Sequence, residues 1–178
     1  EQNLKDRKLR ILFAEGFILM GCLVTVFNYI SYHLLEAPFQ LSQSWIGLIS
    51  IAYLAGIYSS SKAAQWSFKY GRAKVLPLML LMMMAGLLIT LIPALWAILL
   101  GLIIFAFAFF AAHSTASSWV SVQAIQYRAV AASLYLFCYY IGSSLLGSSG
   151  GLIWENFGWV GINLSVVLVL AVGLFLTF

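Results

Sequence analysis

Two ionisable side chains lie inside long apolar stretches of this sequence. Glu15 falls about one helical turn into the first stretch, and His113 falls within the fourth. An ionisable group inside a bilayer is costly, so its presence is a functional hypothesis in itself. We predict that Glu15 and His113 form a hydrogen bond facing a central cavity, which would suit proton handling. The alternatives are a helix-fixing polar contact for the pair or, for Glu15 alone, snorkelling toward the interface or pairing with Arg10.

A second set of polar side chains is suited to contact with a small molecule. Asn28 and Tyr29 lie toward the far end of the first stretch, and Tyr139 lies in the fifth. An amide and phenols in an apolar cavity would suit a neutral or polyhydroxylated compound. Interhelical hydrogen bonding is the simpler alternative.

Enzymatic chemistry is not predicted. The run Gly147-Ser148-Ser149-Gly150 reads G-x-S-G, but a nucleophilic serine needs a histidine within hydrogen-bond reach. Ser149 and His113 fall near opposite ends of their stretches, so their depths differ by roughly 20 Å at the rise of a helix. Cys22 and Cys138 fall near the middles of apolar stretches, where disulfides and metals are not expected. We predict no metal and no cofactor.

The composition requires lipid as the solvent for these residues. Of 178 residues, 63% are hydrophobic and 8% are charged, which is too little polar surface for a soluble protein. Six apolar stretches of about 20 residues match the bilayer core, where only helices and closed barrels satisfy their own backbone. We predict an all-α membrane protein with a linker at residues 1–10 and a bundle at residues 11–178. The six predicted spans are residues 11–34, 44–66, 74–92, 94–117, 129–154 and 159–178.

All nine basic residues fall on one side of these spans. Four precede the first span, four flank the turn between the second and third, and Arg128 precedes the fifth. The turns on the other side hold Glu36 and Glu155 and no Lys or Arg. Because Lys and Arg are retained in cytoplasmic loops, both chain ends are predicted to be cytoplasmic. The net charge of +4 is therefore an orientation signal, and no nucleic-acid partner is predicted.

The spans differ in character and repeat one order. The first and fourth carry Glu15 and His113, while the third and sixth are almost uniformly aliphatic and are predicted to lie outermost. The second and fifth carry ridges of small residues, which let neighbouring backbones approach, and are predicted to be contact helices. Such a repeated order is typical of two inverted three-helix repeats. The ridges comprise Ala52, Gly56, Ser60 and Ala64, and Ser143, Gly147 and Gly151.

Several segments resemble the major facilitator superfamily (MFS). The turn that holds Lys69, Gly71, Arg72 and Lys74 resembles the end of a cytoplasmic loop motif of that family, although Phe68 stands where the motif has an acid. Residues 142–159 resemble the family's eleventh helix and the turn into its twelfth. The segments that are similar to the C-terminal half of a bacterial inner-membrane member are residues 12–17, 26–30, 109–114 and 133–137.

The resemblance implies the C-terminal six-helix half of a secondary active transporter that works by alternating access. Its first and fourth helices would line a cavity completed by an absent N-terminal half. It implies proton-coupled efflux, by antiport, of a small molecule such as a sugar or a drug-like compound across the bacterial inner membrane. The alternative is a non-transporting membrane scaffold, or a channel-like dimer of two copies. The start at Glu1 and the end inside an apolar run are what a piece of a longer chain would show.

Overall fold

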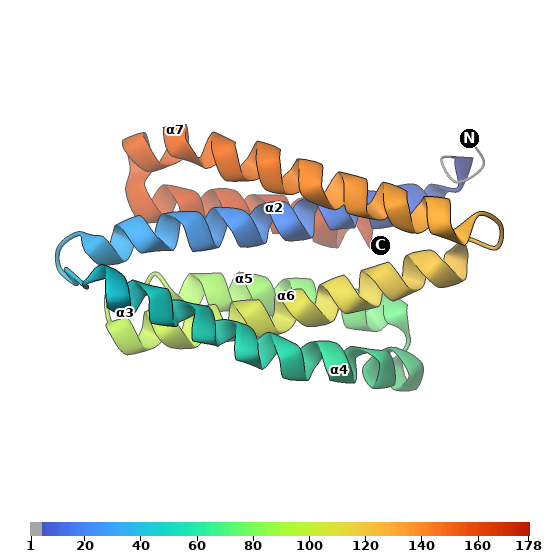
Figure 1. The fold of residues 1–178 in the computed structure, drawn as a ribbon, viewed down its shortest axis with the longest axis horizontal. Coiled ribbons are helices and arrows are strands. Elements are labelled where there is room, and N and C mark those ends of the chain that lie inside the picture. Colours follow the sequence, from blue (N-terminus) through green and yellow to red (C-terminus); the bar gives the residue numbers. More distant parts are fainter. Residues whose placement is uncertain (1–4) are drawn as a thin grey trace.

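The computed structural model describes residues 5–178 as a bundle of antiparallel helices (Figure 1). The elements are α2 (Arg7–Leu35), α3 (Gln43–Gly47), the 3-10 turn η1 (Leu48–Ile51), α4 (Ala52–Tyr70), α5 (Arg72–Ile89), α6 (Leu95–Gln123) and α7 (Arg128–Leu176). No strand occurs among these described residues. The predicted all-α class is therefore confirmed. Residues 1–4 of the predicted linker lie outside the described residues, and α2 already begins at Arg7.

Helix α7 consists of two limbs that run in opposite directions. Gly158 breaks the helix with φ 58° and ψ −150°, a conformation that is accessible to glycine and strained for other residues. Figure 1 shows the first limb, in orange, running away from the end at which the chain enters it, and the second limb, in red, returning. The break falls between the predicted fifth and sixth spans.

Among residues 5–178, four helices are long and apolar enough to cross a bilayer, namely α2, α5, α6 and α7. Helix α4 is not among them, because serines and Lys62 lower its hydropathy. The predicted second span is divided among α3, η1 and α4, of which η1 is a short 3-10 turn. The count of six spans therefore stays a prediction.

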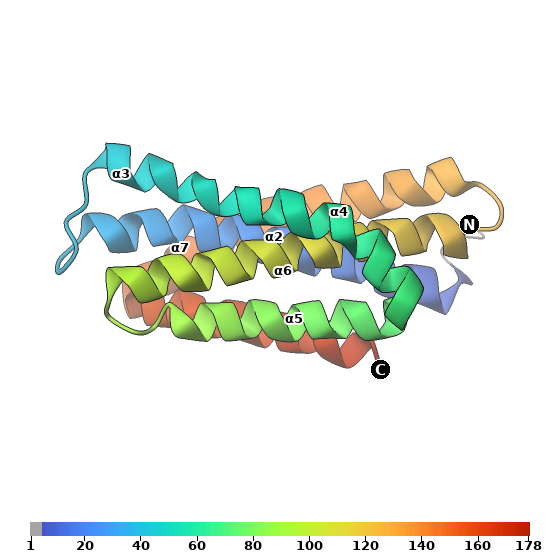
Figure 2. The same cartoon turned by 90° about the horizontal axis from the view of Figure 1, so that it is seen from below.

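The helices lie in three layers, as the two perpendicular views show (Figures 1 and 2). Helix α4 and the first limb of α7 lie on one side, α2 and α6 lie in the middle, and α5 and the second limb of α7 lie on the opposite side. The two aliphatic segments thus share one outer side. The helices that carry Glu15 and His113 are the central ones.

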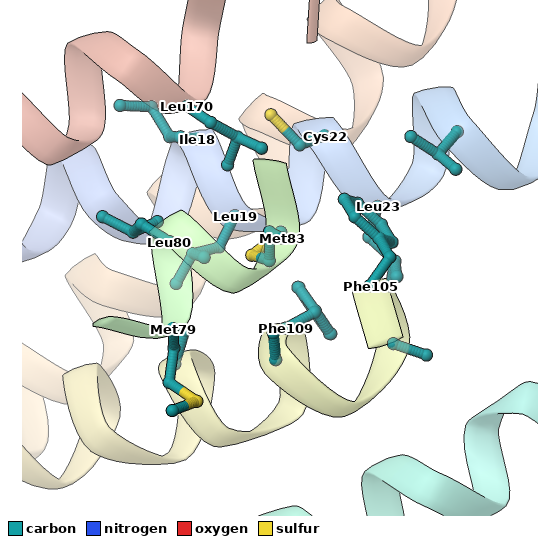
Figure 3. Packing of buried hydrophobic residues seen from close by; sticks show 14 of the residues in the cluster. Ile18, Leu19, Cys22, Leu23, Met79, Leu80, Met83, Phe105, Phe109 and Leu170 are labelled. Atoms are coloured by element: carbon teal, nitrogen blue, oxygen red, sulfur yellow. The ribbon is translucent and has the colours of Figure 1, made fainter. Parts of the chain in front are cut away.

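The core fills the space among α2, α5, α6 and the second limb of α7 (Figure 3). Leu19, Met83, Phe105 and Leu170 are fully buried there. Because lipid tails are as apolar as these side chains, tight packing and interhelical hydrogen bonds hold the helices together.

Glycine brings α2 and the first limb of α7 into backbone contact. A Cβ atom on Gly142 would collide with the backbone carbonyl oxygen of Phe17. A Cβ atom on Gly21 would lie 2.8 Å from the carbonyl oxygen of Gly142. Of the predicted ridge on this limb, Gly147 is buried, whereas Ser143 and Gly151 are half-buried. The closest approach therefore falls at Gly142, one position before the predicted ridge.

On α4, only the first two residues of the other predicted ridge lie in the buried contact surface. Ala52 and Gly56 are buried, and Gly56 lies against the ring of Phe110 on α6, but Ser60 is half-buried and Ala64 is exposed. A spacing of four exceeds the 3.6 residues of a helical turn, so such a ridge rotates by about 40° per step away from its neighbour. The buried stripe continues instead through Ser59, Ala63 and Ser67.

We expect Gly142→Ala to destabilise the protein by about 1–3 kcal/mol, because the main chain of Phe17 cannot move aside as a side chain would. Gly151→Ala is the matched control, since its Cβ atom would meet only the Tyr29 hydroxyl at 3.6 Å. Both changes improve helix propensity equally, so their difference reports packing. Thermal unfolding in detergent micelles measures it. Equal melting temperatures for the two variants would contradict the close approach.

Candidate functional site

The basic residues gather at one end of the bundle. Figure 1 places the start of α2, the turn between α4 and α5, and the turn between α6 and α7 at the same end. In the loop-motif turn, Gly71 adopts φ 85° and reverses the chain. The Nε of Arg72 donates to the Oγ of Ser118 on α6 at 3.5 Å, and Lys69 lies over the ring of Tyr70. Lys74 lies in the first turn of α5.

His113 pairs with a tyrosine rather than with Glu15. Its Nδ1 lies 3.0 Å from the hydroxyl oxygen of Tyr135 on the first limb of α7, so one of these two groups donates to the other. The Tyr139 ring lies 4.8 Å from the imidazole, centroid to centroid. His113 and Tyr139 are half-buried, and Tyr135 is buried. Imidazole takes up and releases a proton near neutral pH, and the Tyr135 phenol can donate a hydrogen bond to it or accept one from it, so this cluster is suited to proton handling.

Glu15 is buried, and neither carboxyl oxygen has a hydrogen-bond partner. The predicted hydrogen bond to His113 is therefore wrong. Its physical reason is rotation: successive helix residues point about 100° apart, and it is Gly16 that faces Tyr135. The Glu15 carboxyl lies instead beside Gly173 on the second limb of α7. Gly16 and His113 both lie against Tyr135, so Glu15 and His113 lie at similar depth.

The predicted small-molecule contacts are divided between two places. Asn28 is exposed and lines a pocket of about 550 Å³ with Tyr32, Ser31 and Gln43 at the end of the bundle opposite the basic residues. Tyr29 also lines it, but its hydroxyl donates to the Gly147 carbonyl at 3.2 Å, so it serves an interhelical bond. Tyr139 belongs to the His113 cluster.

Among the described residues, no group of three or more metal-binding side chains is found. Ser149 is exposed and its hydroxyl donates to the Leu146 carbonyl, one turn earlier in its own helix. Neither observation points to a metal centre or a nucleophile.

Known transporters match nearly the whole chain. The inner membrane transport protein YnfM of Escherichia coli is 48% identical over 96% of the chain and 41% of its own length. The uncharacterized MFS-type transporter YybF of Bacillus subtilis is 43% identical over 98% of the chain and 43% of its own length. An uncharacterized transporter of Buchnera aphidicola is 47% identical over 98% of the chain and 42% of its own length. No family model matches the chain.

The chain belongs to the major facilitator superfamily. It spans about two-fifths of the length of the curated relatives it matches, which fits a C-terminal half. Glu15 and His113 lie on its two central helices, α2 and α6.

Sequence reasoning missed a belt of aromatic rings that crosses the superfamily bundle. The ring of Phe27 on α2 packs against that of Tyr53 on α4, with 4.7 Å between the ring centroids. The Tyr53 ring packs in turn against Phe110 of α6, with 5.8 Å between the centroids. The belt continues through Phe109 to His113. Aromatic residues are common in apolar spans, so only their contacts across three helices distinguish these. The belt joins α4 to the His113 cluster.

Asp6 ties the start of α2 to the end of α6. Its carboxylate caps the helix by accepting from the backbone amides of Lys8 and Leu9, and it accepts from Nε2 of Gln123 at 2.8 Å. The Gln123 hydrogen bond, more than any other interaction, lowers the pKa of Asp6 below its ordinary value of 3.8. The two central helices are thereby fastened at the basic end.

We expect Glu15→Met to stabilise the protein by about 1–3 kcal/mol, because a buried carboxyl without a partner costs free energy that an apolar side chain of similar size does not. The measurement is the melting temperature in detergent. Glu36→Met at an exposed turn is the control and should leave it unchanged. A lower melting temperature for Glu15→Met would mean that the carboxyl has a stabilising partner.

The hydrogen bond between Gln123 and Asp6 predicts that the stability of the protein depends on pH. A carboxyl whose folded pKa is lowered contributes stability above its ordinary pKa and loses it as the pH falls through the folded value. We therefore expect Gln123→Ala to lower the melting temperature at pH 6 and to have little effect well below the folded pKa of Asp6. Gln65→Ala, at an exposed position on α4, is the control. If Gln123→Ala lowered the melting temperature by the same amount at every pH, the predicted role of the Asp6 hydrogen bond would be wrong.

Proposed function

We propose that this chain is the C-terminal half of a secondary active transporter in the bacterial inner membrane, with both chain ends cytoplasmic. In this proposal it works by alternating access and exports a small molecule in exchange for protons. The single observation that carries the proposal is the hydrogen-bonded pair of His113 and Tyr135, set among aromatic rings in the central helices of a chain with transporter relatives.

Polar groups exposed on one face of the bundle favour the presence of a protein partner that covers this face. Asn28 is exposed and His113 is half-buried, although both lie at membrane depth in the proposed orientation. Polar groups facing lipid are unfavourable, so such a face favours contact with protein or with a water-filled cavity. An N-terminal six-helix half would provide both. A second copy of this chain is the alternative occupant.

We assign separate roles to the polar residues. His113 accepts and releases the transported proton through Tyr135, and Glu15 is a second protonation site at similar depth on α2. Asn28 and Tyr139 contact the substrate through an amide and a phenol, which favours a neutral compound, a sugar or a drug-like molecule among them. Tyr29 supports the position of Asn28 through its bond to the Gly147 carbonyl.

The proposal is tested with the full-length polypeptide in proteoliposomes that carry an imposed proton gradient. A panel of neutral compounds is added, and dissipation of the gradient is followed with a pH-sensitive dye. We expect His113→Ala to abolish compound-induced proton flux and Tyr135→Phe to reduce it. His33→Ala is the matched control, because His33 stacks on Trp159 away from the cluster.

Two results would contradict the proposal. Flux that survives both His113→Ala and Glu15→Gln would remove these residues from the mechanism. Ion conduction without any compound would favour the channel-like alternative.

A further inference from the structure

An apolar groove of about 600 Å³ runs between the two limbs of α7. Helix α2 contributes Phe13, Ala14 and Phe17 to it, and the second limb of α7 contributes Val169 and Val172. These side chains offer almost no hydrogen-bonding groups. The groove is therefore suited to a hydrocarbon chain rather than to a polar solute.

A single charged side chain stands among the residues that line this groove. Arg10 is exposed, and among residues 5–178 no ion pair occupies its guanidinium group. Arg7 and Lys8 precede it in the first turn of the same helix. A free guanidinium beside other cations attracts a phosphate group, and a net negative headgroup more than a zwitterionic one.

The groove matches the depth of one bilayer leaflet. From Arg10 to Ile18, which also lines it, α2 rises about 12 Å, against about 15 Å for half of the hydrocarbon core. A smaller cavity of about 60 Å³ shares Leu146 and Val169 with the groove and extends it toward Thr25. The two cavities thus follow α2 from Arg10 to Thr25, with the charge at one end.

We propose that this groove binds an anionic phospholipid. An acyl chain lies along α2 between the limbs of α7, and the headgroup phosphate pairs with Arg10. The proposal rests on the orientation in the proposed function, because Arg10 must lie at headgroup level. It does not require transport.

The test is native mass spectrometry of the protein released from membranes that contain equal amounts of phosphatidylglycerol and phosphatidylcholine. We expect the protein to retain phosphatidylglycerol preferentially. Arg10→Ala should reduce that retention several-fold, Arg10→Lys should keep most of it, and Val172→Trp should reduce it by filling the groove. Arg128→Ala is the matched control, since Arg128 stands at the same end but outside the groove and bonds the Ala124 carbonyl.

The outcomes distinguish a specific phospholipid site from two alternatives. Equal loss in Arg10→Ala and Arg128→Ala would overturn the proposal in favour of general attraction to the basic end. Loss in Val172→Trp alone, with both phospholipids retained equally by the unaltered protein, would mean an acyl-chain site without headgroup selection. Melting temperatures identify any variant that fails to fold, and Arg10→Lys then still separates charge from packing. Because binding is measured without flux, a failed transport assay leaves this test intact.

Discussion

The bilayer offers no hydrogen bonds, and most of this structure follows from that constraint. The hydroxyl groups of Ser59, Ser60 and Ser61 donate to carbonyls of their own helix. At the end opposite the basic residues, Asn163 on the second limb of α7 donates to the Leu87 carbonyl and to the Thr90 hydroxyl. Polar side chains therefore find their partners within the protein, either in their own helix or in a neighbouring one. Against this background, a buried polar group without a partner is the exception that needs a functional explanation.

Among the described residues, Asn163 lacks a partner only at its Oδ1, whereas Glu15 lacks one at both carboxyl oxygens and is the clearest exception. Tyr135 explains its setting. The Tyr135 ring covers Gly16, and its hydroxyl bonds His113, so one side chain links α2, α6 and the first limb of α7. Tyr135 thus occupies the position at which Glu15 was expected. The carboxyl is directed to the second limb of α7, beside Gly173. The two intramembrane ionisable groups are neighbours in depth but belong to separate environments.

Sequence patterns predicted the helices better than their faces. The lengths of the apolar stretches predicted where helices lie, and the break at Gly158 falls where the fifth and sixth spans were separated. Rotation about each axis was harder to predict, because one residue of error turns a side chain by about 100°. That error explains why the predicted bond of Glu15 is missing. The smaller drift of a four-residue spacing, about 40° per step, explains why Ser60 and Ala64 lie outside the contact surface. Tyr53 and Phe110 carried no signal, since their importance lies in contacts between helices.

We infer that the face bearing Asn28 and His113 borders a water-filled cavity, whereas α5 and the second limb of α7 face lipid. Thiol accessibility in intact membranes tests it directly, after Cys22 and Cys138 have been replaced. The account predicts that Asn28→Cys and Ser117→Cys react with a small, charged thiol reagent. Leu78→Cys and Leu168→Cys, which are exposed in the isolated chain, should not react because lipid covers them. Reaction at the two leucine positions, with none at Asn28 and Ser117, would contradict the account.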